Sequence, residues 1–406
     1  MSGQSIIIRA DASAKNGGGH VMRCLNLARE LEAQGAAVRW ACSRETLDIM
    51  PAVNNFNPIV VCDTDMQNGT FFDDAQQTAQ ANRIKEAVQS AGKTIDAVIV
   101  DQYFLSAPFQ DALKGFAGKI VAIDEKINRR HSADIIVDFI PHAPDEWHKS
   151  GHVKPETTLL SGPAYKMLSP LFQEKAKERK RIKATFQTAR VKEKRVVITS
   201  GAVDGVNLIG RVLKAIASDV TLKKNMRYDI PLFSSAPHIK DIRHAVTTMK
   251  SRGFNIHLHE NCTTVSDLMK QADLNIGSAS AAAFEAGAIG GVAGIYYDCG
   301  HMQDKIGRLV VDKSGGFYMG HHSHFGPGLL LNRMRQILDN PSLTSSRQTN
   351  SARICDGQGA KRVASRILAS LSPQQTQEQT QEQTQVQPQQ QPQARHKRFH
   401  PFFDKN

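Results

Sequence analysis

The sequence predicts an α/β protein with two doubly wound, Rossmann-like domains that face a cleft, and two observations support this. Short apolar runs alternate with amphipathic stretches along most of the 406 residues, as expected where crossover helices join parallel strands. A charged stretch at residues 175–194 interrupts the alternation, which begins again at residue 195. A chain of this length can build two domains with separate cores.

The first half opens with a strand, a glycine turn and a helix. Residues 6–9 form a short apolar run that ends before Asp11, which is typical of a buried strand. From Val21 to Gln34 the apolar residues follow helical spacing, and Gly35 ends the helix. Beyond it the pattern predicts a helix at 74–91 and strands at 38–42, 97–100, 120–123 and 135–137.

The second half repeats this order. An apolar run at 195–199 is followed by a Ser-Gly turn and a helix at 207–217. Further strands are expected at 228–233, 256–258, 274–276 and 292–296. The predicted domains are therefore an N-terminal domain of residues 1–174, a basic linker of residues 175–194, and a C-terminal domain of residues 195–372. The basic stretch, which includes Arg179, Lys180 and Arg181, is interpreted as a solvated helix surface or linker.

Residues 373–406 form a tail of different composition. As far as residue 393 it consists almost wholly of Gln, Thr, Glu and Pro, with no apolar face. Such a segment cannot bury enough surface to offset its ordering entropy, so we expect it to be disordered. Its last residues, 395–406, are basic and aromatic and form either an inert extension or a docking peptide whose partner is unknown.

Composition argues against several classes of protein. The net charge of +12 is not accompanied by interleaved aromatic residues, so no nucleic-acid partner is expected. No apolar run approaches the roughly 18 residues that cross a membrane, and the N-terminus does not read as a signal peptide, which predicts a cytoplasmic protein. The six cysteines show no metal-ligand spacing, so they are interpreted as buried thiols and no metal site is expected.

The first candidate site is the glycine turn at residues 17–20. Glycines allow a ligand to approach the backbone closely, and the following helix N-terminus favours an anion. His20 stands at the carboxyl end of the predicted sheet, where it can take a proton from water. The alternative is a tight turn without a catalytic role. The stretch is not a dinucleotide fingerprint, because Met22 replaces the third glycine, and no Walker A loop is present, so no cofactor is expected.

Further candidates follow other predicted strands. Asp101 with Tyr103, and Asp124 with Glu125, end two strands of the first half and can hold sugar hydroxyls or position a base. Their alternatives are helix caps or surface charges.

In the second half, small-residue turns at 200–204, with Asn207, and at 277–280 precede helices that are open to phosphate. Glu285 can accept hydrogen bonds from a ribose diol; the alternatives are Ser280 as a helix cap and Glu285 on a solvated face.

Together these segments resemble the UDP-2,4-diacetamido-2,4,6-trideoxy-β-L-altropyranose hydrolases of pseudaminic acid biosynthesis. The resemblance covers roughly residues 5 to 310, and the Gly-x-Gly-His-x-x-Arg segment is its most specific part. The matching segments are residues 9–13, 17–25, 100–103, 123–125, 162–165, 200–204 and 272–285.

The resemblance implies a glycosyltransferase B-like fold that binds a UDP-sugar, mainly through the C-terminal half. It implies hydrolysis at the anomeric carbon without a required metal, with His20 as the base for the attacking water. The substrate-binding residues that it implies, together with the candidates above, are Gly18, Gly19, Arg23, Asp101, Tyr103, Tyr165, Asp204, Asn207, Ser278, Ser280 and Glu285.

Three departures from the family pattern affect the sugar-nucleotide side. Ala202 replaces a usual glycine, Ser169 replaces a usual arginine, and residues 301–303 replace an expected Asn-Gln pair. They leave the identity of the sugar open. Two other functions also remain open, namely a glycosyltransferase on the same scaffold and a nucleotide-sugar-binding protein without catalysis.

Overall fold

The computed structural model of the protein describes residues 3–13, 17–64, 72–143, 145–186, 193–201, 203–262, 264–300 and 302–371. The expected disordered tail, like turn residues 14–16, lies outside the described residues.

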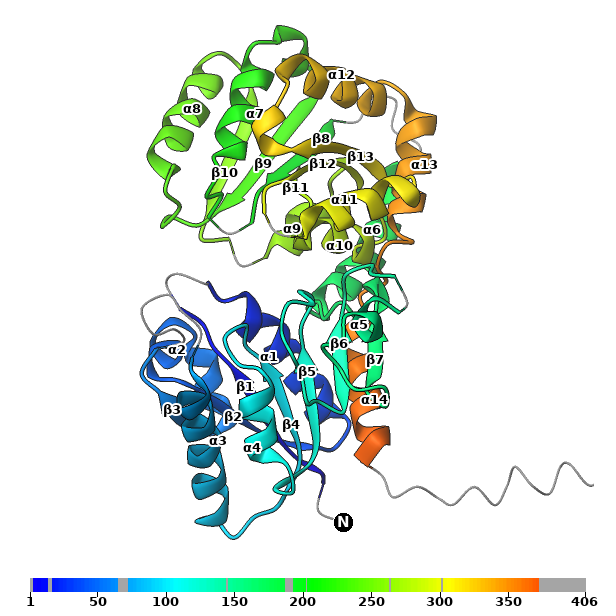
Figure 1. Ribbon diagram of the computed structural model, residues 1–406. Helices are drawn as coiled ribbons and strands as arrows, with labels where there is room; N and C mark the ends of the chain where they lie inside the picture. The colour runs from blue at the N-terminus through cyan, green and yellow to red at the C-terminus, as the bar shows by residue number, and fades with distance from the viewer. Residues whose placement is uncertain are drawn as a thin grey trace, which may run out of the picture. The chain divides into compact units, whose positions relative to one another are not determined.

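The first half is built on a sheet of seven parallel strands in the order β3-β2-β1-β4-β5-β6-β7 (Figure 1). The chain runs outward from β1 to β3 and then returns to add β4 on the other side of β1. This places the topological switch point, where open α/β sheets bind ligands, between β1 and β4. The strands are β1 (Ser5–Ala10), β2 (Ala37–Ser43), β3 (Ile59–Cys62), β4 (Ile95–Asp101), β5 (Ala117–Ile123), β6 (Ile135–Asp138) and β7 (Thr158–Ser161).

The second half repeats the architecture with six parallel strands in the order β10-β9-β8-β11-β12-β13. Its switch point lies between β8 and β11. The strands are β8 (Lys194–Thr199), β9 (Met226–Leu232), β10 (Asn255–Glu260), β11 (Leu274–Ser278), β12 (Ala293–Asp298) and β13 (Gly316–His321). The predicted fold class of two doubly wound α/β domains is confirmed.

Helices join the strands of both sheets. In the first half they are α1 (Gly19–Ala33), α2 (Arg44–Ile49), η1 (Pro51–Phe56), α3 (Asp74–Gln89), α4 (Ala107–Leu113), α5 (Glu146–Lys149) and η2 (Pro163–Tyr165). Then follow α6 (Leu171–Phe186), α7 (Leu208–Ala217), η3 (Val220–Lys223), α8 (Ile239–Ser251), α9 (Val265–Met269), α10 (Ala281–Ala288), α11 (Gln303–Asp312), η4 (His322–His324), α12 (Pro327–Leu338), α13 (Pro341–Ser351) and α14 (Gly359–Leu371). In the described part of the chain, no helix combines the length and apolar character that crossing a membrane requires.

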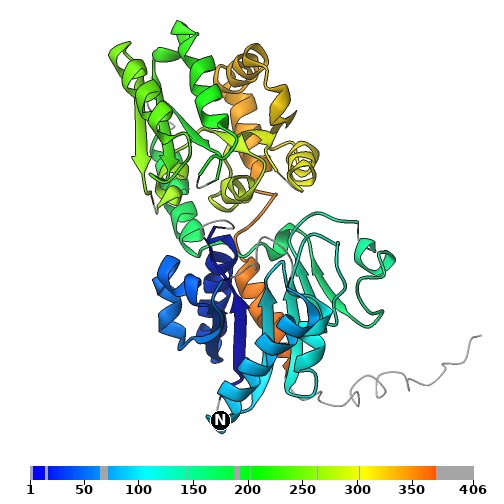
Figure 2. The ribbon, with the colours of Figure 1, turned by 60° about the vertical axis from the view of Figure 1, so that its left-hand side comes forward.

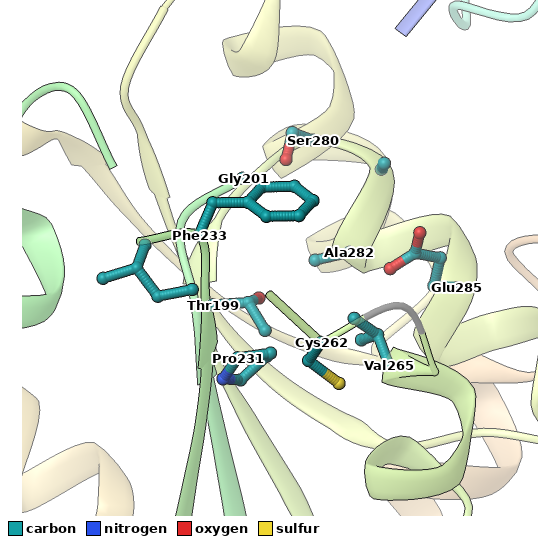
Figure 3. A pocket seen from close by; sticks show the side chains of 11 residues that line it. Thr199, Gly201, Pro231, Phe233, Cys262, Val265, Ser280, Ala282 and Glu285 are labelled. Atoms are coloured by element: carbon teal, nitrogen blue, oxygen red, sulfur yellow. The ribbon is translucent and has the colours of Figure 1, made fainter. Parts of the chain in front are cut away.

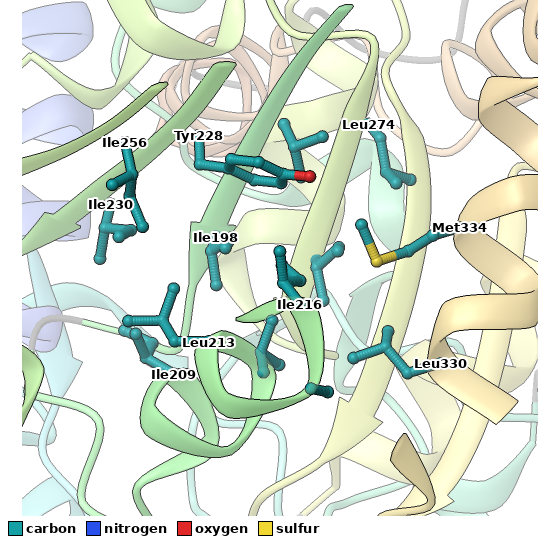
Figure 4. Close-up of a cluster of buried hydrophobic side chains, with 14 of the residues drawn as sticks. Ile198, Ile209, Leu213, Ile216, Tyr228, Ile230, Ile256, Leu274, Leu330 and Met334 are labelled. Atoms are coloured by element: carbon teal, nitrogen blue, oxygen red, sulfur yellow. The ribbon is translucent and has the colours of Figure 1, made fainter. Parts of the chain in front are cut away.

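The sheets are buried on both faces. In β1, Ile6 and Ile8 belong to the core on one face and Ile7 to the core on the other, as the alternation of side chains along a strand requires. In the second half, α7 and α12 cover one face of the sheet, where Leu213 and Met334 pack against strand residues such as Tyr228 (Figure 4). These cores fix the strand ends, and the strand ends carry the candidate site.

The last helix, α14, packs against the first half. Its residues Val363, Ala364, Ile367 and Leu368 belong to the same core as α1 and β1, and Figures 1 and 2 show the helix in orange beside the first sheet. The predicted domain of residues 195–372 therefore contains a helix whose apolar face is buried by the other half. The boundaries at residues 174 and 194 stay a prediction.

The basic stretch after residue 174 is largely helical, since α6 runs through it. Its interpretation as a solvated surface is wrong for Arg179, which is 3% exposed. The Arg179 guanidinium donates four hydrogen bonds to backbone carbonyls, those of Met269, Lys270, Ala272 and Gly291. Lys180 and Arg181 on the neighbouring positions are exposed. A helix turns each residue by about 100°, so a basic run can place one member inside and two outside.

Candidate active site

The glycine turn brings His20 into the first turn of α1. Gly17 has a φ of +73°, a left-handed conformation that favours glycine, and Gly18 is the N-cap of α1. A Cβ atom at Gly19 would meet no atom within 4 Å, so the backbone there is open to a ligand. The sequence-predicted Gly18, Gly19 and His20 thus lie at the carboxyl end of β1, next to the switch point.

Asp101, at the end of β4, holds His20. His20 Nδ1 lies 2.6 Å from Asp101 Oδ1, and the His20 side chain is 14% exposed. The contact links α1, the first helix after β1, to the end of β4, and so spans the switch point between these two strands. A carboxylate that orients an imidazole in this way is the arrangement found in catalytic dyads and triads.

Arg23 closes the group from the next turn of α1. Its Nε and Nη2 atoms bind the two Asp101 oxygens at 2.5 and 2.6 Å, and Cys24 Sγ donates to Oδ2 at 3.2 Å. Burial alone would raise the pKa of Asp101, but the charges of Arg23 and His20 outweigh it and hold this pKa well below its usual range. Asp101 is therefore ionised at neutral pH and fully occupied by protein donors.

These contacts determine which His20 nitrogen is free. The Asp101 carboxylate only accepts hydrogen bonds, so the proton of a neutral His20 sits on Nδ1. Arg23 Nη2 also lies 3.1 Å from Nδ1 and could donate only to an unprotonated Nδ1, but the 2.6 Å contact with the carboxylate is shorter and requires a proton between the two atoms, so it favours the Nδ1–H tautomer. Nε2, which no described residue hydrogen-bonds, keeps its lone pair as an acceptor. This nitrogen is thus free to accept a proton.

Tyr103 and Glu125 flank this dyad. The Tyr103 ring meets the His20 ring edge to face, with centroids 4.3 Å apart, and the Tyr103 hydroxyl donates to Glu125 Oε1. Burial raises the pKa of Tyr103, so its hydroxyl stays protonated. Asp124 takes a different role from its neighbour, because it is buried with Arg129 at 3.1 Å and His131 at 2.9 Å. Of these two acids, only Glu125 reaches the site.

A first cavity, here called the α10 cavity, lies at the carboxyl end of the second sheet and has a volume of about 230 Å³. Figure 3 shows Glu285 on α10 and Phe233 among its walls. Burial raises the pKa of Glu285 to about 7, and the charge of Lys166 partly opposes this. The cavity is lined by Thr199, Gly201, Pro231, Leu232, Phe233, Cys262, Val265, Ser280, Ala281, Ala282 and Glu285.

A second cavity, here called the cleft cavity, is lined by residues of both halves and has a volume of about 330 Å³. It shares Ser280 and Ala281 with the α10 cavity, so the two cavities meet at the N-terminus of α10. Ser278 and Ser280 hydroxyls lie 2.8 Å apart at this junction. The other residues of the cleft cavity are Arg23, Tyr103, Glu125, Lys126, Phe139, Ile140, Lys166, Phe284, Met302, Gln303 and Ile306.

Of the sequence-predicted residues, Arg23, Tyr103, Ser280 and Glu285 line these cavities. His20 is not a lining residue but contacts Arg23 and Tyr103, which are.

Three other predicted residues have structural positions instead. Tyr165 packs against the core of the first half and lines a different cavity with Arg366. The Asp204 carboxylate accepts hydrogen bonds from the Leu208 and Ile209 amides at 2.9 and 2.8 Å, so it caps α7. Asn207 is the left-handed N-cap residue of that helix.

Lys166 is a site residue that the sequence did not reveal. It follows Tyr165, and it lines the cleft cavity whereas Tyr165 faces the core. The direction of each side chain is set by the short helical turn at 163–165, and no composition or motif signal distinguishes the two positions. Of the three departures from the family pattern, Ala202 and His301 lie outside the described residues.

Comparison with solved structures confirms the architecture. MurG of Acinetobacter baumannii superposes with a TM-score of 0.63 at 13% identity, over 90% of this chain and 99% of that protein. UDP-GlcNAc 2-epimerase from Neisseria meningitidis gives 0.63 at 10% identity, over 90% and 100% of the two chains. A glycosyltransferase from Rickettsia africae gives 0.61 at 11% identity, over 92% and 100%. The chain has a glycosyltransferase B-like fold.

Sequence comparison adds less. No family model matches the chain. An uncharacterized protein from Methanocaldococcus jannaschii is 24% identical over 286 residues, which are 69% of this chain and 53% of that protein. The chain thus spans about half the length of the curated relative that it matches.

Within the described ranges, no group of three or more His, Cys, Asp or Glu side chains is placed to hold a metal ion.

Proposed function

We propose that the protein is a hydrolase that cleaves a UDP-linked 2,4-diacetamido-2,4,6-trideoxyhexose at the anomeric carbon and releases UDP and the free sugar for nonulosonic acid biosynthesis. The observation that carries the proposal is the His20–Asp101 contact of 2.6 Å, which leaves Nε2 free as a base. The resemblance of residues 17–25 to the hydrolase family and the glycosyltransferase B-like fold support the same assignment.

The two cavities suggest how the substrate is held. The nucleoside occupies the α10 cavity, where Glu285 accepts hydrogen bonds from the ribose diol. The diphosphate lies at the junction, beside Ser278 and Ser280, where the free amides of the helix N-terminus favour negative charge. The sugar then extends into the cleft cavity, toward Arg23 and Tyr103.

In the reaction, His20 Nε2 takes a proton from water, and the water oxygen forms a bond with C1 of the sugar. The bond between C1 and the β-phosphate oxygen breaks, and its electron pair leaves with UDP. Attack from the face opposite to UDP inverts the configuration at C1. Asp101 stabilises the imidazolium that forms, since its carboxylate faces Nδ1.

The test is the substitution His20→Asn. We expect turnover to fall by on the order of 10² or more, because the base is lost. Turnover is measured as UDP release in a coupled assay and as release of the free sugar by proton NMR. UDP affinity should stay within a few-fold, since His20 is not part of the α10 cavity. His244→Asn, at an exposed position of α8, is the matched control and should keep full turnover. Near-normal turnover of His20→Asn would exclude His20 as the base.

The same assay separates the other functions. A glycosyltransferase releases UDP only when an acceptor is supplied, and a binding protein shows UDP-sugar binding by titration without release of sugar over hours. Either result would contradict the hydrolase.

A further inference from the structure

The proposed mechanism leaves several polar groups of the cleft cavity unused, among them Lys126 and Gln303, and two others carry the inference. The first is the second carboxylate oxygen of Glu125. Oε1 accepts hydrogen bonds from the Tyr103 hydroxyl and, at 3.5 Å, from Arg23 Nη1. Oε2 is buried without a hydrogen-bond partner among the described residues, and Glu125 as a whole is 8% exposed. Buried carboxylate oxygens are normally hydrogen-bonded, so this atom requires a donor that a ligand can bring.

The second group is the Lys166 ammonium. It lies 3.6 Å from the centroid of the Phe139 ring and 5.5 Å from that of Phe284, and it makes no ion pair within the described part of the chain. Burial, assisted by the charge of Arg23, lowers the pKa of Lys166 to about 8, although Glu125 and Glu285 oppose the shift. Lys166 therefore offers hydrogen-bond donors that no acceptor among the described residues takes.

Besides the polar residues Lys126, Ser280 and Gln303, the remaining wall of the cavity has a large apolar part. Phe139 and Ile140 follow β6, Phe284 belongs to α10, and Met302 and Ile306 come from the start of α11. A sugar that carries only hydroxyl groups would place polar atoms against this wall without partners, which is unfavourable. A ligand that fits needs a donor, an acceptor and an apolar group close together.

An acylated amine has these three features. Its N–H can donate to Glu125 Oε2, its carbonyl oxygen can accept from Lys166 Nζ, and its methyl group can pack against the phenylalanine rings. We propose that Glu125 and Lys166 select N-acylated amino sugars by binding the amide in the cleft cavity. This inference rests on the proposed function in one respect, which is that a UDP-sugar occupies the site.

The experiment measures binding, not turnover, in the full chain carrying His20→Asn. Calorimetry compares three probes: UDP, UDP-glucose, and a UDP-2,4-diacetamido-2,4,6-trideoxyhexose. We expect the diacetamido sugar to bind at least about tenfold more tightly than UDP-glucose, since a site built for an amide leaves polar groups unpaired with a hydroxyl sugar. Adding Lys166→Met or Glu125→Gln should reduce this ratio to less than about threefold and leave the affinity for UDP within about twofold.

Lys93→Met removes the same charge at an exposed position and is the matched control, which should keep the wild-type ratio. An unchanged ratio in Lys166→Met and Glu125→Gln, or the absence of any preference before these changes, would overturn the inference. If the diacetamido sugar binds more tightly than UDP-glucose but the protein with His20 unchanged releases no sugar, the hydrolase proposal fails and the selection of N-acylated sugars stands. If none of the three probes binds, both proposals fail.

Discussion

Asp101 is the residue on which the candidate site depends. It accepts hydrogen bonds from His20, Arg23 and Cys24, and all three donors lie on one helix. A carboxylate occupied in this way has no free oxygen for a sugar hydroxyl, so we propose that Asp101 positions His20 and does not bind substrate, whereas the resemblance implied that it does. Its sequence-based interpretation left both roles open, and the geometry favours the positioning of a base.

We therefore expect Asp101→Asn to lower kcat by about 10² to 10⁴. The amide NH₂ group can donate to Nδ1, which would move the imidazole proton to Nε2 and remove the base; the upper limit comes from the comparable substitution in a serine protease. The measurement is UDP release under saturating substrate, with circular dichroism to check folding, since Arg23 also loses its partner charge. Asp63→Asn is the matched control, because Asp63 also follows a strand but is highly exposed. A kcat within threefold of wild type would remove Asp101 from the mechanism.

How far single residues could be predicted depended on the local signals around them. Asp101 ends a buried apolar run, whereas His20 and Arg23 lie at the start of a helix that a glycine turn marks. Parallel strands bring the segments at their carboxyl ends to one edge. Lys166 lies five residues after the last residue of β7, beyond a short helical turn, and there a difference of one position decides whether a side chain faces the core or the cavity. Asp204 was expected to bind the ligand, but its carboxylate caps α7. A capping carboxylate and a ligand-binding one occupy the same position in a strand–helix turn, so the sequence does not distinguish them.

At the level of elements, α6 shows how one buried side chain fixes a helix. The four carbonyls that Arg179 binds belong to the last residue of α9, the segment after it and the turn before β12. Burial lowers the pKa of Arg179 to about 10, with Asp273 opposing, yet the guanidinium remains charged at neutral pH. Charge-assisted hydrogen bonds of this kind tie α6 to the second half, immediately before β8 begins.

Arg179→Met should destabilise the protein by about 3 kcal/mol or more, because it leaves several buried carbonyls without donors. Differential scanning calorimetry should show the loss as a lower transition temperature. Lys180→Met on the exposed face of the same helix is expected to change stability by less than about 0.5 kcal/mol. Equal effects of the two substitutions would contradict the anchoring role of Arg179.

The elements themselves were largely predictable, because most strands are apolar runs and most helices are amphipathic. The exceptions are β3, β7 and β13. β3 and β7 have four residues each, and β13 is a half-buried strand at the sheet edge. Edge strands lose the continuous apolar pattern, and strands this short leave little periodicity to detect.

At the scale of the whole molecule, the chain crosses between its halves twice. It enters the second half through α6 and returns through the segment before α14, which completes the core over α1. Sequence patterns show the face of a helix that is buried but not the partner that buries it. For this reason the apolar spacing of α14 could not predict against which half of the protein the helix packs.

Two truncations test this arrangement. Ending the chain after residue 371 should leave turnover and the transition temperature unchanged, because the Gln-rich tail has no apolar face to contribute. Ending it after residue 357 removes α14, whose Val363, Ile367 and Leu368 contribute roughly 5 kcal/mol by their burial. We expect that protein to be insoluble or to unfold at a markedly lower temperature. A soluble, active protein without α14 would show that the helix is dispensable.

The return of α14 also affects how the protein can be made and recombined. During synthesis the first half leaves the ribosome first, but its core stays incomplete until the last described helix has been added. The face over α1 is exposed in that interval, when association with other chains competes with folding. A chimera that exchanges one half with a relative must therefore cut the chain at two points, before α6 and before α14, and carry the last helix with the first sheet.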